Sequence, residues 1–385
     1  MNKIKNSSMF LLWTGAAISI AEIYTGGLVA PLGISKGIAA IVIGHIIGTL
    51  LLAVGGYISF SDKRNAMDKV RDSLGPLGAK LVAAINVLQL IGWSAIMIIQ
   101  GGRAISGMVK ISYSISLLIV AAAVFLWAYF FNNHSKRVND ISVIILVILC
   151  FAVFFKLGAG GHAALSGNIN FTTAIELSIS MPVSWLPLIG DYAKDGTSKK
   201  GVFLSSFWGY FFGSVLMYIM GCLITVYTGK DVIEYISGMG IAASLIVLLS
   251  TVTTTFIDVY SAVISSKQIF TVKNENLFIV IYSILATGLA FVFPMESYQD
   301  FLLTIGSVFV PVYTVVFIDY FIRKKTETRL MNYIGVFAAV LGTVIYKYFS
   351  NISFGIPTVY VFIITSCVYL GISILWALGR KPMVQ

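Results

Sequence analysis

The chain has 385 residues, of which 58% are hydrophobic and only 11% are charged, and its formal net charge is +10. Soluble domains contain roughly 45–50% apolar and about 25% charged residues, so this composition excludes an ordinary soluble enzyme and indicates that lipid surrounds most of the chain. The basic residues lie in short breaks between apolar stretches rather than on a polar surface, which argues against binding to nucleic acid.

Apolar stretches long enough to cross a bilayer follow one another along the sequence. A transmembrane helix needs about 20 mostly apolar residues. The pattern predicts twelve such helices, at residues 9–33, 36–60, 79–107, 112–132, 139–158, 171–190, 201–227, 240–270, 277–294, 299–322, 330–350 and 355–379. We find no metal-ligand spacing, no phosphate-binding loop and no nucleophile with its base. We therefore predict an all-α integral membrane protein that is not an enzyme and has no cofactor.

The lysines and arginines are unevenly distributed between the two sides of the predicted membrane. With a cytoplasmic N-terminus, 20 of the 26 lie in cytoplasmic segments. The exceptions are Lys36, Arg103, Lys110, Lys156, Lys230 and Lys347. Cytoplasmic loops normally carry this excess, so we expect a multi-pass protein of the inner cell membrane with both termini in the cytoplasm.

The first predicted helix carries residues that disfavour an unbroken helix in lipid. Ser19, Glu22, the pair Gly26 and Gly27, and Pro31 all lie within it. A carboxyl group at this depth costs several kcal/mol unless it is paired, protonated or hydrated, which makes Glu22 a functional candidate. The alternative is a neutral glutamic acid that donates to a nearby carbonyl.

The second and third helices contain three further polar or aromatic residues of interest. Gln89 and Trp93 are four residues apart and share one helix face, with Gly92 leaving room beside the indole. An indole and an amide suit a flat heterocycle, one by stacking and the other by hydrogen bonding. The alternatives are an interhelical amide bond and a lipid-facing tryptophan. We interpret His45 as a packing residue.

The sixth helix is interrupted like the first, with Pro182, Ser184, Trp185 and Pro187 close together. The two interrupted helices begin successive five-helix units. Paired interruptions of this kind are typical of inverted-repeat transporters with a binding site near the bilayer midplane. The alternative is that glycine and proline are simply common in membrane helices.

The eighth helix carries a polar face formed by Thr251, Thr254, Thr255 and Asp258. Hydroxyl oxygens beside unwound backbone carbonyls suit a hard cation such as Na⁺. Threonine and serine hydroxyls also bond to their own helix carbonyls in membrane helices, which is the alternative reading.

Four stretches resemble the nucleobase:cation symporter-1 family, which includes cytosine, hydantoin, uracil and allantoin permeases. Residues 184–194 resemble the motif S-W-x-P-x-x-x-D-[YF]-x-[RK], residues 253–262 resemble T-T-N…[YV]-S-A, and residues 306–323 resemble G-x-x-x-x-P…D-Y-F-x-x-R. Residues 15–33 are similar to the branch assigned to hydroxymethylpyrimidine. The chain departs from these patterns at Thr255, where relatives have Asn, and at Arg323, which comes one residue early.

The resemblance implies a leucine-transporter-type fold of two five-helix inverted repeats, at residues 1–158 and 159–325, followed by two C-terminal helices and a cytoplasmic tail at 326–385. The implied substrate-binding residues are Glu22, Gln89, Trp93, Ser184 and Trp185, to which we add Asp258, one turn beyond the residue that replaces Asn. The implied cation ligands are the carbonyls of Ile18, Ala21 and Ser250 and the hydroxyls of Thr253 and Thr254.

The expected function is cation-coupled import of a small planar pyrimidine by alternating access, with Na⁺ or H⁺ as the coupling cation. Hydroxymethylpyrimidine, a thiamine precursor, is the first expectation. Cytosine, another nucleobase or an amino acid are alternatives on the same fold, and a channel or a membrane enzyme is the alternative outside this class. The expected partners are the pyrimidine, the cation and the bilayer, with no nucleic acid, and the expected state is a monomer.

Overall fold

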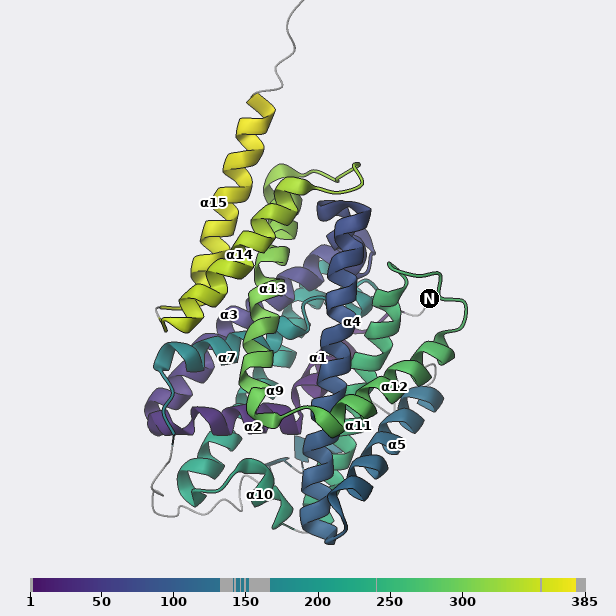
Figure 1. Ribbon diagram of the computed structural model, residues 1–385, viewed down its shortest axis with the longest axis vertical. Helices are drawn as coiled ribbons and strands as arrows, with labels where there is room; N and C mark the ends of the chain where they lie inside the picture. The colour runs from purple at the N-terminus through teal and green to yellow at the C-terminus, as the bar shows by residue number, and fades with distance from the viewer. Residues whose placement is uncertain are drawn as a thin grey trace, which may run out of the picture.

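The computed structural model describes residues 3–131, 141, 143–145, 147–148, 150–151, 167–239, 241–353 and 355–378. These residues form a bundle of helices (Figure 1). The α-helices are α1 (Asn6–Ala17), α2 (Ile20–Val29), α3 (Gly33–Asp62), α4 (Ala66–Val109), α5 (Tyr113–Phe131), α7 (Phe171–Ser184), α8 (Ile189–Ala193), α9 (Lys199–Thr228), α10 (Val232–Ser237), α11 (Ile241–Ser266), α12 (Glu275–Val292), α13 (Tyr298–Ile318), α14 (Tyr333–Asn351) and α15 (Pro357–Leu378). Short turns of helix occupy Ala30–Leu32, Met295–Ser297 and Asp319–Arg323.

Nine helical segments in the described part of the chain are long and apolar enough to cross a membrane. They correspond to the predicted helices other than the first, fifth and sixth. The first and sixth are divided into shorter pieces, and the fifth, at 139–158, lies largely outside the described residues. The prediction of an all-α, multi-pass membrane protein is therefore confirmed.

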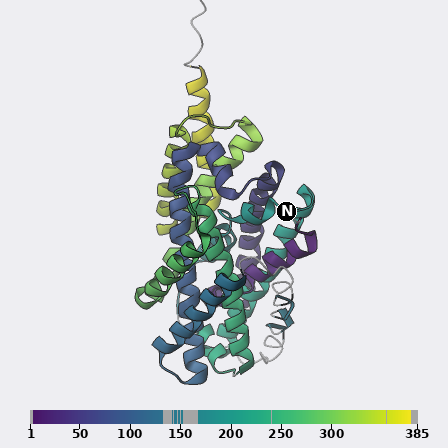
Figure 2. The same cartoon turned by 90° about the vertical axis from the view of Figure 1, so that its right-hand side faces the viewer.

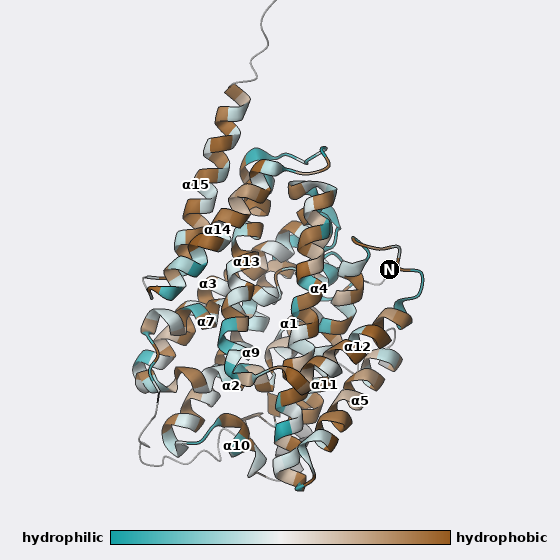
Figure 3. Cartoon of the chain, viewed as in Figure 1, coloured by the Kyte–Doolittle hydropathy of each residue, from teal (hydrophilic) through white to brown (hydrophobic). Residues whose placement is uncertain are grey.

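The helices divide into an inner group and an outer group. In α4, in α11 and in the segment containing α13, 78% of the residues in the most apolar 18-residue stretch are buried inside the protein. Only 28% of the residues in the equivalent stretch of α12 and 17% of those in α15 are buried. Figure 2 shows the same bundle from the side, and Figure 3 shows that α5, α12 and α15 are largely apolar on the outside of the bundle. Outer helices with apolar surfaces fit a protein whose solvent is lipid.

The first predicted helix is broken where its sequence is most polar. Helix α1 ends at Ala17, Ser19 is extended with φ of −140°, and α2 starts at Ile20. The Ser19 hydroxyl accepts a hydrogen bond from the Glu22 backbone N–H at 3.3 Å and so caps α2. The interruption expected from the sequence is therefore present, and it places Glu22 in the first turn of a new helix.

The sixth predicted helix also ends early. Helix α7 finishes at Ser184, and the chain turns through Trp185 before the short helix α8. Pro182 lies in the last turn of α7, and Pro187 lies in the turn that follows. Proline removes a backbone donor, which explains why the helix does not continue to residue 190 as predicted.

Helix α4 begins at Ala66, ahead of the predicted start at residue 79, and consists of two helical pieces joined at a kink. The kink is at Gly75, whose φ of +79° is not helical, just before Pro76. A side chain at Gly75 would also collide with the carbonyl of Arg329. Residues 66–74 therefore form a separate helical piece, and the kink that follows it packs against the chain before α14.

Helix α9 packs very closely against α1 and α2. A Cβ atom added at Gly213 would lie 2.9 Å from the Thr14 carbonyl, and one added at Gly221 would overlap the Ile23 carbonyl. Small residues allow membrane helices to approach in this way. The close approach brings one face of α9 against the first turn of α2.

We expect Gly221→Ala to destabilise the protein, because its new methyl group must displace the backbone of α2. Overpacking of this kind costs about 1–3 kcal/mol. Gly288→Ala in α12 is the matched control, since nothing lies within 4 Å of the added atom, and it should leave stability unchanged or raise it slightly. Thermal unfolding in detergent measures both variants, and equal midpoints would contradict the proposed packing.

Candidate functional site

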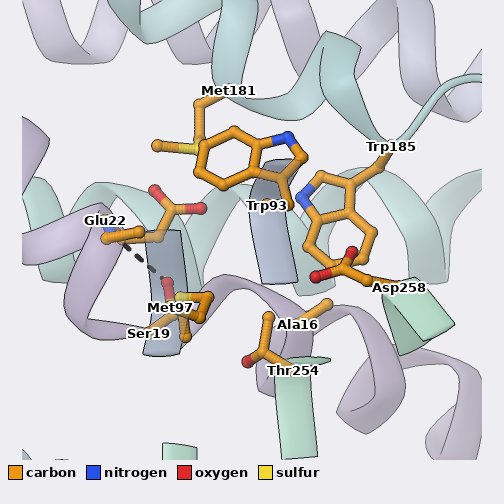
Figure 4. A pocket seen from close by; sticks show the side chains of 10 residues that line it. Ala16, Ser19, Glu22, Trp93, Met97, Met181, Trp185, Thr254 and Asp258 are labelled. Carbon is orange, nitrogen blue, oxygen red and sulfur yellow. Dashed lines mark hydrogen bonds between the residues drawn. The ribbon is translucent and has the colours of Figure 1, made fainter. Parts of the chain in front are cut away.

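A cavity lies inside the bundle beside the break between α1 and α2. Its free volume is about 10 Å³. Its walls are formed by Ala16, Ser19, Ala21, Glu22, Trp93, Met97, Met181, Trp185, Thr254 and Asp258 (Figure 4). These residues come from α1, α2, α4, α7, α11 and the α7–α8 turn. The cavity thus meets both broken helices.

Two carboxyl groups and two indole rings dominate this cavity. In Figure 4 the carboxyl groups of Glu22 and Asp258 lie on opposite sides of the Trp93 ring, and Trp185 lies on the Asp258 side. Glu22 is 1% exposed, Asp258 is 3% exposed, and both indoles are 7% exposed. The cavity therefore offers aromatic surfaces between two acidic groups at low exposure to solvent.

Glu22 is held by two side chains of α9. The Tyr210 hydroxyl donates to Glu22 Oε1 at 2.6 Å, and Ser214 Oγ lies 2.5 Å from Glu22 Oε2. The Trp185 indole N–H in turn donates to the Tyr210 hydroxyl at 2.8 Å. The sequence also allowed a neutral Glu22 that donates to a backbone carbonyl, but these contacts are with side chains. Each carboxyl oxygen has a side-chain partner instead.

Trp93 is a wall of the cavity, and its ring packs edge-on against Tyr298 and Phe301. The space beside Gly92 is filled by Phe301, since a Cβ added there would lie 2.7 Å from that ring. The room expected beside the indole is therefore taken up within the protein. The Trp93 indole N–H has no hydrogen-bond partner among the described residues, so a donor is available at the cavity wall.

Gln89 and Ser184 lie behind the cavity wall and are bonded to each other. Gln89 Nε2 donates to the Ser184 carbonyl at 2.9 Å, and the Ser184 hydroxyl donates to the Met181 carbonyl at 2.6 Å. The interhelical amide bond that was the alternative reading is thus present and ties α4 to the end of α7. Gln89 Oε1 is buried without a hydrogen-bond partner in the described chain.

The hydroxyl groups of α11 differ in whether they form hydrogen bonds within their own helix. Thr253 Oγ1 donates to its own helix, at 2.8 Å from the Leu249 carbonyl and 3.2 Å from the Ser250 carbonyl, and Ser250 Oγ donates to the Val247 carbonyl. Thr254 Oγ1 is buried at the cavity wall with no hydrogen-bond partner among the described residues. Only Thr254 of these three therefore presents a hydroxyl that its own helix does not use.

The backbone at the first helix break is also engaged. The Ala21 carbonyl accepts from the Thr25 hydroxyl at 2.7 Å and from the Tyr298 hydroxyl at 3.3 Å. Of the five expected cation ligands, Ala21 and Thr254 line the cavity, whereas Ile18, Ser250 and Thr253 do not.

Sequence reasoning missed three residues that surround Glu22. Two of them, Tyr210 and Ser214, lie four residues apart on one face of α9 and were not named; the third, His45 of α3, whose Nε2 lies 2.5 Å from Ser214 Oγ, was named only as a packing residue. A usable signal was present in the glycines at 209 and 213, a small-xxx-small spacing that indicates close helix contact. Sequence alone did not show which helix α9 contacts.

A second hollow, with a free volume of about 210 Å³, lies between the ends of α3, α4 and α13. Its walls include Lys69, which forms ion pairs with Asp62 at 2.5 Å and Asp72 at 2.9 Å, and Asp319, which pairs with Arg323 at 2.9 Å. These charges already neutralise one another. The first cavity, with its two indoles, is therefore the better candidate for binding an aromatic molecule.

Comparison of the sequence with known families gives a match over residues 2–373 to a family described as permease for cytosine/purines, uracil, thiamine, allantoin. The vitamin B6 transporter TPN1 of Saccharomyces cerevisiae is 22% identical over 363 residues, which cover 85% of this chain. The match spans 62% of the length of that relative.

Several solved structures share the fold. MHP1, a nucleobase-cation-symport-1 family transporter in a closed conformation with bromovinylhydantoin bound, matches all of this chain and 95% of its own, with a TM-score of 0.81 and 14% identity. Its inward-facing conformation matches with a TM-score of 0.78, also at 14% identity, over all of this chain and 93% of its own. A Na⁺-coupled sialic acid symporter matches 98% of this chain and 96% of its own, with a TM-score of 0.67 and 11% identity. These likenesses establish a leucine-transporter-type fold.

We expect Tyr210→Phe to lower the free energy of unfolding by about 1–3 kcal/mol, because it leaves a buried carboxyl oxygen and the Trp185 indole N–H without a partner. Tyr313→Phe is the matched control, since the Tyr313 hydroxyl is buried without a hydrogen-bond partner in the described chain. That control should be neutral or stabilising. Chemical unfolding in detergent compares the two, and an equal loss in both would contradict the assigned role of Tyr210.

Proposed function

The chain belongs to the family of permeases for cytosine, purines, uracil, thiamine and allantoin and is a transporter of the nucleobase:cation symporter type; we propose that it imports a small planar pyrimidine, with hydroxymethylpyrimidine as the first candidate. The observation that carries this proposal is the cavity with two indole rings between two carboxyl groups. Cytosine and other nucleobases are the alternatives within the same class.

The walls of the cavity favour a flat ring. The free volume of the cavity is only about 10 Å³, about the space for one water molecule, so we expect side chains of the wall to move apart when a ring binds. Indole rings contact flat heterocycles through their faces and edges. A flat heterocycle therefore suits the walls of the cavity.

The polar groups of the cavity suit an aminopyrimidine. Each oxygen of a carboxyl group retains acceptor capacity beyond a single hydrogen bond, so Glu22 can accept from an exocyclic amine while it remains bonded to Tyr210 and Ser214. Thr254 and the Trp93 indole N–H supply unused groups at other edges of the cavity. We assign the roles of substrate contact to Glu22, Trp93, Trp185 and Asp258, and positioning roles to Gln89 and Ser184.

Vitamin B6 is a second candidate class, favoured by the similarity to a vitamin B6 transporter. Vitamin B6 is a hydroxymethylated pyridine, so it shares a flat ring and hydroxymethyl groups with hydroxymethylpyrimidine but lacks the aminopyrimidine edge. A competition panel of hydroxymethylpyrimidine, cytosine, uracil and pyridoxine, measured on purified protein, separates these candidates. If pyridoxine binds more tightly than both hydroxymethylpyrimidine and cytosine, the substrate belongs to the pyridine class and not to the pyrimidine class.

Transport by this fold is expected to alternate access to the cavity from the two sides of the membrane. The two broken helices supply half-helix ends at the cavity, as is typical of transporters that move substrate together with an ion. We propose coupling to a cation, a location in the cell membrane and cytoplasmic termini. The uneven distribution of basic residues supports this orientation.

We expect Trp93→Ala to weaken substrate binding about 5- to 150-fold, since contact of a base with an aromatic ring contributes roughly 1–3 kcal/mol. Trp93→Phe should recover part of the loss because it keeps an aromatic ring. Trp208→Ala, on the outer face of α9 where Trp208 is 42% exposed, is the control and should bind normally. Unchanged affinity in Trp93→Ala would remove Trp93 from the site.

Glu22→Gln is expected to weaken binding of aminopyrimidines by roughly tenfold or more, because a buried polar partner is lost at about 1–3 kcal/mol. Pyrimidines without the exocyclic amine should lose much less. Equilibrium binding of cytosine and uracil to the parent and the variant measures the difference. Equal losses for both rings would show that Glu22 does not recognise the exocyclic amine.

A further inference from the structure

A buried line of polar atoms runs from the cavity to His45, and substrate recognition alone does not explain it. Glu22 Oε2 lies 2.5 Å from Ser214 Oγ, and Ser214 Oγ lies 2.5 Å from His45 Nε2. The three residues belong to α2, α9 and α3. Glu22 is 1% exposed, and His45 and Ser214 are fully buried.

The hydrogen on the far side of the histidine ring is determined by its partner. His45 Nδ1 lies 2.8 Å from the backbone carbonyl of Ile41. A carbonyl oxygen only accepts hydrogen bonds, so Nδ1 must carry a hydrogen. In a neutral imidazole Nε2 is then an acceptor, and only in the imidazolium form is it a donor.

The two bonds on this line require two hydrogens, but Ser214 has only one. If Ser214 donates to a neutral His45, Glu22 must be a carboxylic acid that donates to Ser214. If Ser214 donates to a Glu22 carboxylate, His45 must be an imidazolium that donates to Ser214. In both arrangements the line holds one additional proton and has no net charge. Without that proton, one of the two bonds is lost and a negative charge stays buried, which is costly.

The other oxygen of Glu22 supports this count. The hydroxyl of Tyr210 accepts from the Trp185 indole N–H and donates to Glu22 Oε1. Its single hydrogen is therefore already used at Oε1. The proton of a carboxylic acid at Glu22 must then lie on Oε2, which is the oxygen that faces Ser214.

Among the described residues, no lysine or arginine faces Glu22 or His45 to replace this proton. The groups facing Glu22 and His45 are Tyr210 and Tyr218 of α9 and Tyr298 of α13, with Asp258 of α11 across the cavity. On α7, which packs against α3, Glu176 is bonded to Tyr346 and Thr358 instead. In the described ranges no ion pair involves Glu22, Asp258 or His45.

We propose that Glu22, Ser214 and His45 form a proton-binding site and that the proton it holds is the coupling ion of transport. The proposal rests on the proposed function, because it concerns the same cavity. Two proton shifts interconvert the two arrangements: the Glu22 proton passes to Ser214 Oγ as the Ser214 proton passes to His45 Nε2.

The position of Glu22 links this proton to the substrate. Its carboxyl group belongs both to the cavity wall and to the proton-binding line, so a ring that contacts Glu22 changes the relative free energies of the protonated and deprotonated site. By linkage, proton binding must change the affinity for the ring to the same extent. A neutral pyrimidine carried with one proton moves one positive charge inward in each cycle.

The test uses the full-length protein in liposomes with radiolabelled hydroxymethylpyrimidine, and cytosine in parallel. A gradient of one pH unit, acidic outside, should drive accumulation up to about tenfold at one proton per substrate, with or without Na⁺. Ser214→Ala and His45→Gln should abolish this accumulation while substrate exchange by counterflow continues. Ser178→Ala is the matched control, because its hydroxyl bonds only to its own helix, at the Ala174 carbonyl, and it should behave like the parent.

The outcomes separate the two proposals. Accumulation driven by Na⁺ alone, or normal proton-driven accumulation in Ser214→Ala, would overturn the proton site and leave the transport of pyrimidines intact. A parent protein with no counterflow of either ring would overturn the proposed function itself. If both variants fail to fold, the test uses the parent protein alone. Its uptake of substrate should raise the pH of a weakly buffered external solution by removing one proton per ring. No rise in the external pH would overturn the proton site.

Discussion

The buried carboxyl group of Glu22 is the constraint on which the rest of this structure depends. A carboxyl group in the interior of a membrane protein is costly unless hydrogen bonds or a proton compensate for the lost water. Here α9 supplies Tyr210 and Ser214 to the two carboxyl oxygens, and α3 supplies His45 behind Ser214. These contacts require the close approach of α9 to the first broken helix, which the glycines on α9 permit. Helix packing, the helix break and the polar network are therefore parts of one arrangement.

That arrangement connects the fold to transport. The break at Ser19 places Glu22 in the first turn of α2, where the positive end of the helix dipole and the cavity meet. The second break places Trp185 on the cavity wall, and its indole N–H reaches Glu22 through Tyr210. Both broken helices thus converge on one carboxyl group. In the proposed mechanism, substrate and proton both act on this carboxyl group and so act on both broken helices, the elements that inverted-repeat transporters move against each other.

Much of the fold could be predicted from sequence, whereas the contacts within the site could not. Apolar length gave the helices, and the serines, glycines and prolines around residues 19 and 184 located both breaks, because these residues disfavour an unbroken helix in lipid. Glu22, Trp93, Thr254 and Asp258 were singled out by residue type, Trp185 was implied by the family resemblance, and all five line one cavity. The partners of Glu22 were missed because they depend on which helices pack together. From sequence, His45 is interpreted as a packing residue, because the partners of its two ring nitrogens are visible only in the structure.

The central claim is that one carboxyl group couples the ring to a proton, and proton exchange on binding tests it most directly. Calorimetric titration of the purified protein in two buffers of different ionisation enthalpy gives the number of protons taken up per ring, after correction for the ring's own titration. The account predicts net proton uptake that rises towards one as the pH exceeds the range in which the free site is protonated, with no dependence on Na⁺. Zero uptake at every pH, with affinity that depends on Na⁺, would contradict it.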